Sequence, residues 1–352
     1  MIAFNFVSLL QIVPDSHVAA SIHAYLRPFA ETGNFSGAVL VARKGQVLLR
    51  ESYGMASYDL QVANAVETRF HIASVSEAFT AAAILQLEEQ GRVNVTDLVS
   101  QFVPDFPDGD RITVNELLTQ RSGISDVVDL ADYDSFARSP HTLAELVAKI
   151  AGLSPAFQPG SAYRYSSSNY ELLAFIVEKV SGDNYGAYLR NHIFRPADMP
   201  NSGDDGGGSQ LVPFAASGYR PAGIAGYEKM PYLDWSNRAG DGSLYSTVDD
   251  LYRFDRALYT NVVLTAPERQ KYFAECPGSC YGWHIGTRLG HRVMSAQGRS
   301  PGFTAELDRF VDDDVTVIVL SNSSSTVSQS PIAEGLAAIV FGQQPPPVAA
   351  GR

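Results

Sequence analysis

The chain has 352 residues, of which 45% are hydrophobic and 18% charged, so it can bury a core as one large domain or two ordinary ones. Its formal net charge is -12, spread over short stretches without a block of like charge or a basic stripe. Because phosphate binding needs clustered Lys and Arg, this pattern argues against a nucleic-acid partner.

The N-terminal segment 1–14 is apolar, has no Lys or Arg, and is too short to span a bilayer. We interpret it as a strand or helix that packs on the core, with a remnant of an export signal as the alternative. The lack of a clear signal peptide favours a cytoplasmic protein.

The next elements follow from local patterns. Two β-rich runs flank Arg-Lys-Gly in the segment 37–49, which predicts a hairpin. The segment 74–90 has apolar residues at helical spacing and is followed by Gly91, so we predict a helix. From about 97 to 270 the pattern is one of helices and loops, with the clearest helix at 170–181 and a flexible loop at 204–209.

Strand character returns near the C-terminal end, where the last apolar run is expected to be a central strand. The predicted strands are 281–286, 291–296, 303–311 and 315–321, followed by a helix at 333–341 and a Pro-rich tail. The two cysteines, Cys276 and Cys280, either close a small disulfide loop or are free thiols. No His or Cys cluster accompanies them, so we expect no metal.

Strands at both ends and helices between them predict an α+β fold. We expect an antiparallel sheet built from both chain termini, flanked by helices, with a largely helical insertion. The predicted organisation is a single domain over 15–345 and a disordered tail over 346–352. Within the domain, the sheet part covers about 15–96 and 275–345, and the helical part about 97–274.

Six short segments follow one another in an order that suggests a family. They are Ser-Val-Ser-Glu at 74–77, Leu-Leu-Thr-Gln-Arg-Ser-Gly at 117–123, Tyr-Ser-Ser at 165–167, Ala-Gly-Asp-Gly-Ser at 239–243, Ala-Gln-Gly at 296–298 and Leu-Ser-Asn at 320–322. Together they resemble the motifs of the serine β-lactamase and penicillin-binding-protein family, in its branch of class C β-lactamases, esterases and D-aminopeptidases. The resemblance runs from about residue 37 to 341 and implies that family's β-lactamase/transpeptidase-like fold.

The resemblance also has departures. The Lys of the family's Ser-x-x-Lys motif is Glu77 in this chain, and the Asn of its Tyr-x-Asn motif is Ser167. The His or Lys of the third motif is Ala296, and the His of Leu-Leu-Thr-His is Gln120. In the family, the Lys lowers the pKa of the motif's Tyr, whereas a carboxylate at position 77 would keep that phenol neutral.

Three functions remain open at this point. In the first, Ser74 attacks a small-molecule ester or amide as in a serine hydrolase or acyltransferase, with Glu77 as the base. In the second, Glu77 and Tyr165 form an acid/base pair in a cyclase, lyase or isomerase, for example one of secondary metabolism. In the third, the chain is a catalytically inactive pseudoenzyme that binds a ligand.

The resemblance further implies residues that would contact a substrate or its oxyanion, and no cofactor. These are Arg299, Ser167, Gln297, Gly298 and Gln120, with the backbone N–H groups of Ser74 and Arg299 as oxyanion donors. Glu77 has a structural alternative, because Ser-x-x-Glu before an apolar helix is also a capping box, in which Glu77 would bond the N–H of Ser74. His71 is expected to be exposed to solvent.

Overall fold

The structure is a computed structural model that describes residues 16–206, 211–222, 226–324 and 330–347. The predicted N-terminal packing segment, most of the predicted tail, and residues 207–209 of the predicted loop lie outside the described residues. No described helix combines the length and the apolar character that a membrane span needs.

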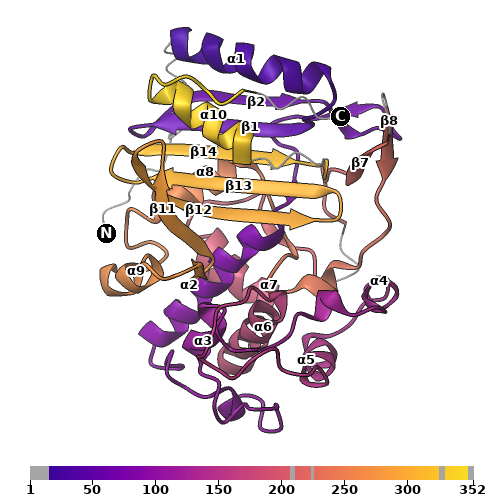
Figure 1. Cartoon of the computed structure of the whole chain (residues 1–352), viewed down its shortest axis with the longest axis vertical. Helices are drawn as coiled ribbons and strands as arrows, with labels where there is room; N and C mark the ends of the chain where they lie inside the picture. The colour runs from indigo at the N-terminus through magenta and orange to yellow at the C-terminus, as the bar shows by residue number, and fades with distance from the viewer. Residues whose placement is uncertain (1–15, 207–210, 223–225, 325–329, 348–352) are drawn as a thin grey trace.

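The centre of the fold is a seven-stranded antiparallel sheet with the strand order β10-β11-β12-β13-β14-β1-β2 (Figure 1). Strand β1 pairs with β2 on one side and with β14 on the other, and Gly37 in β1 lies opposite Ser321 in β14. The predicted hairpin, the central position of the last strand and the sheet from both ends of the chain are therefore confirmed. The strands of this sheet are β1 (Gly37–Arg43), β2 (Gln46–Tyr53), β10 (Ser279–Cys280), β11 (Trp283–Arg288), β12 (His291–Ser300), β13 (Phe303–Phe310) and β14 (Val315–Ser321).

One face of the sheet is covered by α1 (Ser16–Glu31) and α10 (Ser330–Val340), which contact each other (Figure 1). Helix α1 buries Ile22, Leu26 and Phe29, which repeat at helical spacing and form one apolar stripe. Together with the β14 side chains on that face, they make a core separate from the one on the opposite face.

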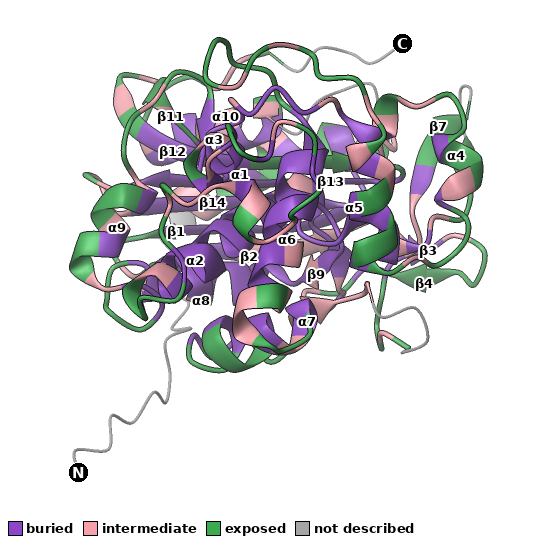
Figure 2. Cartoon of the chain, turned by 90° about the horizontal axis from the view of Figure 1, so that it is seen from below, coloured by how far each residue is buried: buried purple, intermediate pink, exposed green. Residues whose placement is uncertain are grey.

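The opposite face packs on α8 (Val248–Ala257) and on the helical part of the chain. Helix α2 (Ser76–Glu89) runs through the middle of that part and is buried on all sides from Ser76 to Leu87 (Figure 2). Such a helix belongs to an interior, not to a surface. It contacts α6 (Ser167–Ser181), α7 (Tyr185–Leu189) and α9 (Ala266–Tyr272).

The remaining elements are short. The helices are α3 (Val114–Leu118), α4 (Tyr133–Phe136) and α5 (Leu143–Ala151), and the strands are β3 (Met55–Ser57), β4 (Val62–Ala63), β5 (Phe70–His71), β6 (Gly203–Asp204), β7 (Tyr219–Ala222), β8 (Gly226–Lys229) and β9 (Leu244–Ser246).

Candidate active site

Ser74 lies in a single 3₁₀ turn, Ala73–Val75, that leads directly into α2. Ala73 has φ of +46°, a left-handed conformation that is uncommon outside glycine, so the turn that presents Ser74 is strained. Gly298 of β12 packs against this turn. A Cβ on Gly298 would lie 2.3 Å from the carbonyl oxygen of Ile72 and 2.8 Å from the nitrogen of Ser74. Only glycine therefore allows β12 to approach Ser74 this closely.

The part of β12 beside Ser74 has one open edge. Residues 291–295 pair with β11, whereas Ala296–Ser300 pair only with β13 among the described strands. Within this part, Gly298 contacts the turn that carries Ser74. An unpaired strand edge offers N–H and C=O groups to an extended ligand.

A pocket of about 320 Å³ opens at Ser74. Five of the residues predicted for the site line it, namely Ser74, Tyr165, Gln297, Gly298 and Arg299. Sequence reasoning did not find the other lining residues, which are His284, Thr304, Ala305, Glu306 and Ser330. The volume lies at the lower end of the range for small-molecule sites.

Tyr165 joins the two other predicted catalytic groups. Its hydroxyl lies 2.8 Å from Ser74 Oγ and makes a short contact to Glu77 Oε1. The phenol has one proton, so when it donates to a Glu77 carboxylate, the Ser74 hydroxyl must donate to the phenol oxygen. The three groups form a continuous path for a proton from Ser74 to Glu77.

Both titratable members of this path favour their neutral forms. Burial raises the pKa of Glu77 well above its ordinary value, and the nearby Asp241 and Asp126 raise it further, against the opposing effects of Tyr165 and Arg238. The pKa of Tyr165 is also raised well above its ordinary value, by burial of its hydroxyl and by the charge of Glu77, although 38% of the residue is exposed. Tyr165 therefore stays a phenol.

The capping-box alternative for Glu77 does not match the structure. Ser74 lies inside the 3₁₀ turn and is not an N-cap, and neither Ile72 nor Val75, which flank the starts of the two helical segments, makes a side-chain cap. The hydrogen bond found for the Glu77 side chain goes to Tyr165. The alternative was wrong because the 3₁₀ turn Ala73–Val75 leads into α2, so Ser74 does not stand at the N-cap position of that helix.

Gln120 and Ser167 are buried behind the pocket and do not line it. Gln120 Oε1 accepts hydrogen bonds from the Ser166 N–H at 2.9 Å and from the Asn169 side chain at 2.5 Å. The N–H of Ser167 donates to Asp126 Oδ2 at 3.0 Å. These contacts hold the start of α6 and so position Tyr165, which lies two residues before that helix.

A buried ionic cluster lies beneath Glu77. Arg238 forms an ion pair with Asp241, and both residues are buried. Thr80, one turn along α2 from Glu77, donates to the carbonyl of Gly240 at 2.6 Å, which places the Asp241 segment beside Glu77. Asp241 belongs to the Gly-rich segment 239–243, but the sequence around it does not predict that this segment lies beside Glu77 on α2.

The two ends of the pocket differ in charge. Arg299 is exposed, and no ion pair involving it is found among the described residues. Glu306 is buried and accepts from Arg288 at 3.1 Å and from Gln297 at 3.2 Å. Arg299 is therefore more available than Arg288 to bind an anionic group of a substrate, because Arg288 is already paired with Glu306.

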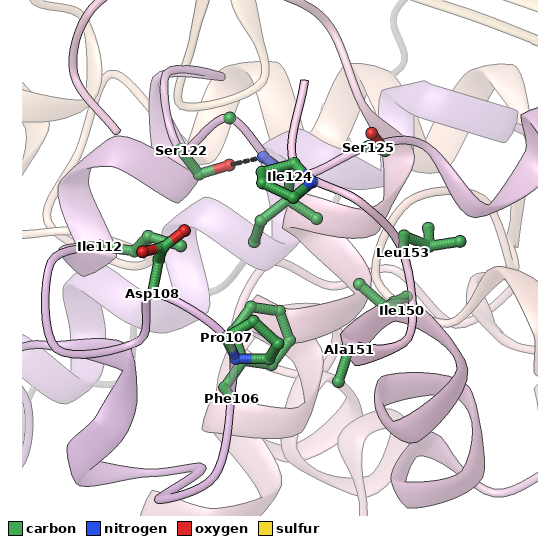
Figure 3. A pocket seen from close by; sticks show the side chains of 12 residues that line it. Phe106, Pro107, Asp108, Ile112, Ser122, Ile124, Ser125, Ile150, Ala151 and Leu153 are labelled. Carbon is green, nitrogen blue, oxygen red and sulfur yellow. Dashed lines mark hydrogen bonds between the residues drawn. The ribbon is translucent and has the colours of Figure 1, made fainter. Parts of the chain in front are cut away.

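Three further features lie outside the Ser74 pocket. His71 is buried, contrary to the expectation of exposure, because it packs on Trp235 and bonds Asp205. Cys276 and Cys280 form a disulfide. A separate cavity of about 20 Å³ lies among Phe106, Ile124 and Ile150 (Figure 3), and it has room for about one water molecule.

Comparisons with known proteins agree with this architecture. The model of the family described as Beta-lactamase matches residues 22–340. Penicillin-binding protein 4* of Bacillus subtilis (strain 168) is 30% identical over 336 residues, which cover 89% of this chain and 74% of that protein. The chain therefore belongs to the β-lactamase family.

Two solved structures show the same fold. The octameric penicillin-binding protein homologue from Pyrococcus abyssi superposes with a TM-score of 0.81 at 24% identity, covering 93% of this chain and 78% of that one. D-amino acid amidase from Ochrobactrum anthropi SV3, complexed with L-phenylalanine amide, also gives 0.81, at 19% identity, covering 92% and 99%.

Proposed function

We propose that the protein is a serine hydrolase or acyltransferase that acts on a small-molecule ester or amide through Ser74. The observation that carries this proposal is the Tyr165 hydroxyl, which contacts Ser74 Oγ and Glu77 Oε1 at once. A nucleophile in contact with a base through one intervening group is the arrangement that activates a hydroxyl.

We further propose that Glu77 replaces the Lys of the family's Ser-x-x-Lys motif as the group that receives the proton. A Lys would favour the phenolate of Tyr165, whereas Glu77 raises the pKa of that phenol. Tyr165 then acts as a relay. It takes the proton of Ser74 as its own proton moves to the Glu77 carboxylate.

Transfer of the acyl group to Ser74 and then to an acceptor would use the same proton path. The Ser74 oxygen forms a bond to the substrate carbonyl carbon while its proton passes through Tyr165 to Glu77. Collapse of the tetrahedral intermediate breaks the bond to the leaving group, which takes the proton back along the same path. Water or another acceptor then repeats the sequence on the acyl-serine, and the proton returns to Ser74.

The oxyanion would be held by the backbone N–H groups of Ser74 and Arg299. Two contacts support this assignment. Glu77 bonds Tyr165 and not the N–H of Ser74, and Gly298 brings the β12 backbone next to the Ser74 nitrogen. The open β12 edge would align the substrate.

The test is covalent labelling of the intact protein with a fluorophosphonate and with a p-nitrophenyl ester, followed by mass spectrometry. We expect one adduct on Ser74, with labelling that increases as the pH rises and Glu77 ionises. Labelling elsewhere, or equal labelling of Ser74→Ala, would contradict the proposal.

A second function has one observation in its favour. Because the pKa of Glu77 is raised, its carboxyl keeps a proton at pH values above 4.5, where an ordinary glutamic acid side chain has already ionised. Glu77 and Tyr165 could then act as an acid/base pair in a cyclisation, elimination or isomerisation that needs no acyl-serine. Activity that survives in Ser74→Ala would favour this second function.

A further inference from the structure

A second and larger cavity, of about 620 Å³, lies beyond the Arg299 end of the Ser74 pocket. We call it the Trp235 pocket. It lies between β5, the 3₁₀ turn Trp235–Arg238 and the turn that joins β12 to β13. Its lining residues include His71, Asp205, Tyr232, Trp235, Pro301 and Phe303.

Flat rings form one wall of the Trp235 pocket. The His71 ring stacks on Trp235 with centroids 3.7 Å apart and an interplanar angle of 12°, and Phe303 meets His71 edge-on at 5.1 Å. His71 Nε2 lies 2.9 Å from Asp205 Oδ2, which fixes the ring. Burial lowers the pKa of His71 despite the opposing effect of Asp205, so the wall carries a neutral imidazole near pH 7.

The Trp235 pocket continues the Ser74 pocket along the same two elements. His71 precedes Ser74 by three residues, and Pro301 follows Arg299 by two in the chain. Ala305 lines the Ser74 pocket, and Phe303, two residues away on the same face of β13, lines the Trp235 pocket. A strand rises about 3.3 Å per residue, so these two positions are about 7 Å apart.

The remaining lining disfavours an anionic occupant. Asp205 and Asp234 contribute two carboxylates, and Lys229 already forms an ion pair with Asp59 at 2.8 Å. Tyr232 is 68% exposed, so an apolar ring in the pocket would cover a large side chain that water now contacts.

From these contacts we propose that the acyl group of the Ser74 substrate carries an uncharged aromatic ring, which lies against Trp235 and Phe303. This inference rests on the proposed function of Ser74 and specifies its substrate class. The ring would bind by stacking and edge-to-face contacts, while the carbonyl reaches Ser74 past Arg299.

The kinetic test compares p-nitrophenyl acetate with p-nitrophenyl 2-naphthylacetate. We expect kcat/KM to be about tenfold or more higher for the naphthyl ester, and Trp235→Ala to bring the ratio of the two values close to one. Trp235→Phe should keep most of the ratio. The matched control is Tyr259→Ala, an aromatic truncation at a different cavity, which should leave the ratio unchanged. An equal preference in wild type and Trp235→Ala would overturn the proposal.

A binding test separates this proposal from the function of Ser74. The Ser74→Ala variant is titrated by calorimetry with 2-naphthylacetamide and with acetamide. We expect binding of the naphthyl amide only, weakened about tenfold or more by adding Trp235→Ala. Such binding without ester turnover in the wild type supports the aromatic site and refutes the serine function. Turnover without naphthyl binding refutes the aromatic site alone.

Discussion

Two buried carboxyl groups in this molecule have opposite tendencies. Asp255 and Glu77 are both almost completely buried. Burial alone would raise the pKa of Asp255, but Arg309 and Arg256 lie in direct contact and lower it below its ordinary value. Glu77 contacts a phenol instead, and its pKa rises well above the ordinary value.

In this pair of residues, the two arginines in contact with Asp255 keep its carboxyl charged, whereas no ion pair of Glu77 is found among the described residues. Asp255 also accepts a hydrogen bond from Thr316 at 2.8 Å, and it ties α8 to the sheet. Glu77 is left able to gain and lose a proton next to a pocket. We therefore regard Asp255 as a structural residue and Glu77 as a chemical one, and four predictions test that distinction.

The largest effect is expected from Ser74→Ala, because it removes the group that Glu77 would serve. Ester turnover should fall by about 10³-fold or more. Ser76→Ala is the matched control, since Ser76 is buried at the start of α2, two residues from the half-buried Ser74, and its hydroxyl has no hydrogen-bond partner among the described residues. Loss of turnover in both variants would point to the helix, not to Ser74.

Asp255→Asn should lower the free energy of unfolding by about 3–5 kcal/mol, because it leaves the buried Arg309 without its charged partner. Urea unfolding measures this value. Any variant that remains folded should keep its ester turnover. A stable variant with impaired turnover would mean that Asp255 has a chemical role after all.

Glu77→Gln should show the reverse pattern. Turnover should fall by about 10²-fold, because an amide cannot accept the proton relayed by Tyr165. Below about pH 4.5, where the Glu77 carboxyl is protonated in the folded protein, the free energy of unfolding should change by no more than about 1 kcal/mol, since Gln keeps the hydrogen bond to Tyr165. Glu88→Gln, farther along the same helix, serves as the control. Unchanged turnover in Glu77→Gln would remove Glu77 from the mechanism.

The smallest effect is a difference in pH dependence. A raised pKa in the folded state means that the folded protein keeps a proton that the unfolded chain loses, so Glu77 makes stability fall as the pH rises above about 4.5. The slope for one proton is at most about 1.4 kcal/mol per pH unit. Glu77→Gln should remove this component of the slope, as measured by urea unfolding across pH. A parallel curve for the two proteins would contradict the shift.

The sequence predicted the sheet well where apolar runs decide structure alone, as in β14. Predictions failed where backbone geometry or distant contacts decide. The strand predicted to start at Tyr281 starts at Trp283, because Tyr281 and Gly282 have positive φ and form a turn. The β12 strand continues to Ser300 beyond its apolar alternation, because its backbone still pairs with β13.

The site was predicted in a similar way. Motif positions were enough to bring Ser74, Glu77 and Tyr165 together as candidates, and the structure places them in contact. The surroundings that set the pKa of Glu77 could not be predicted, because Asp241 is 164 residues away in the chain and reaches it only through tertiary packing. The Trp235 pocket depends on equally distant segments.

The pairing of Gly37 with Ser321 has a consequence for how the protein is made. When β1 leaves the ribosome, the strand beside which it will lie has not been synthesised. At about 5–20 residues per second, the 284 residues from Ala38 to Ser321 take roughly 14–57 seconds to make. During that interval β1 has β2 but not β14, the other of its two final strand neighbours, and the sheet can close only after nearly the whole chain has been translated.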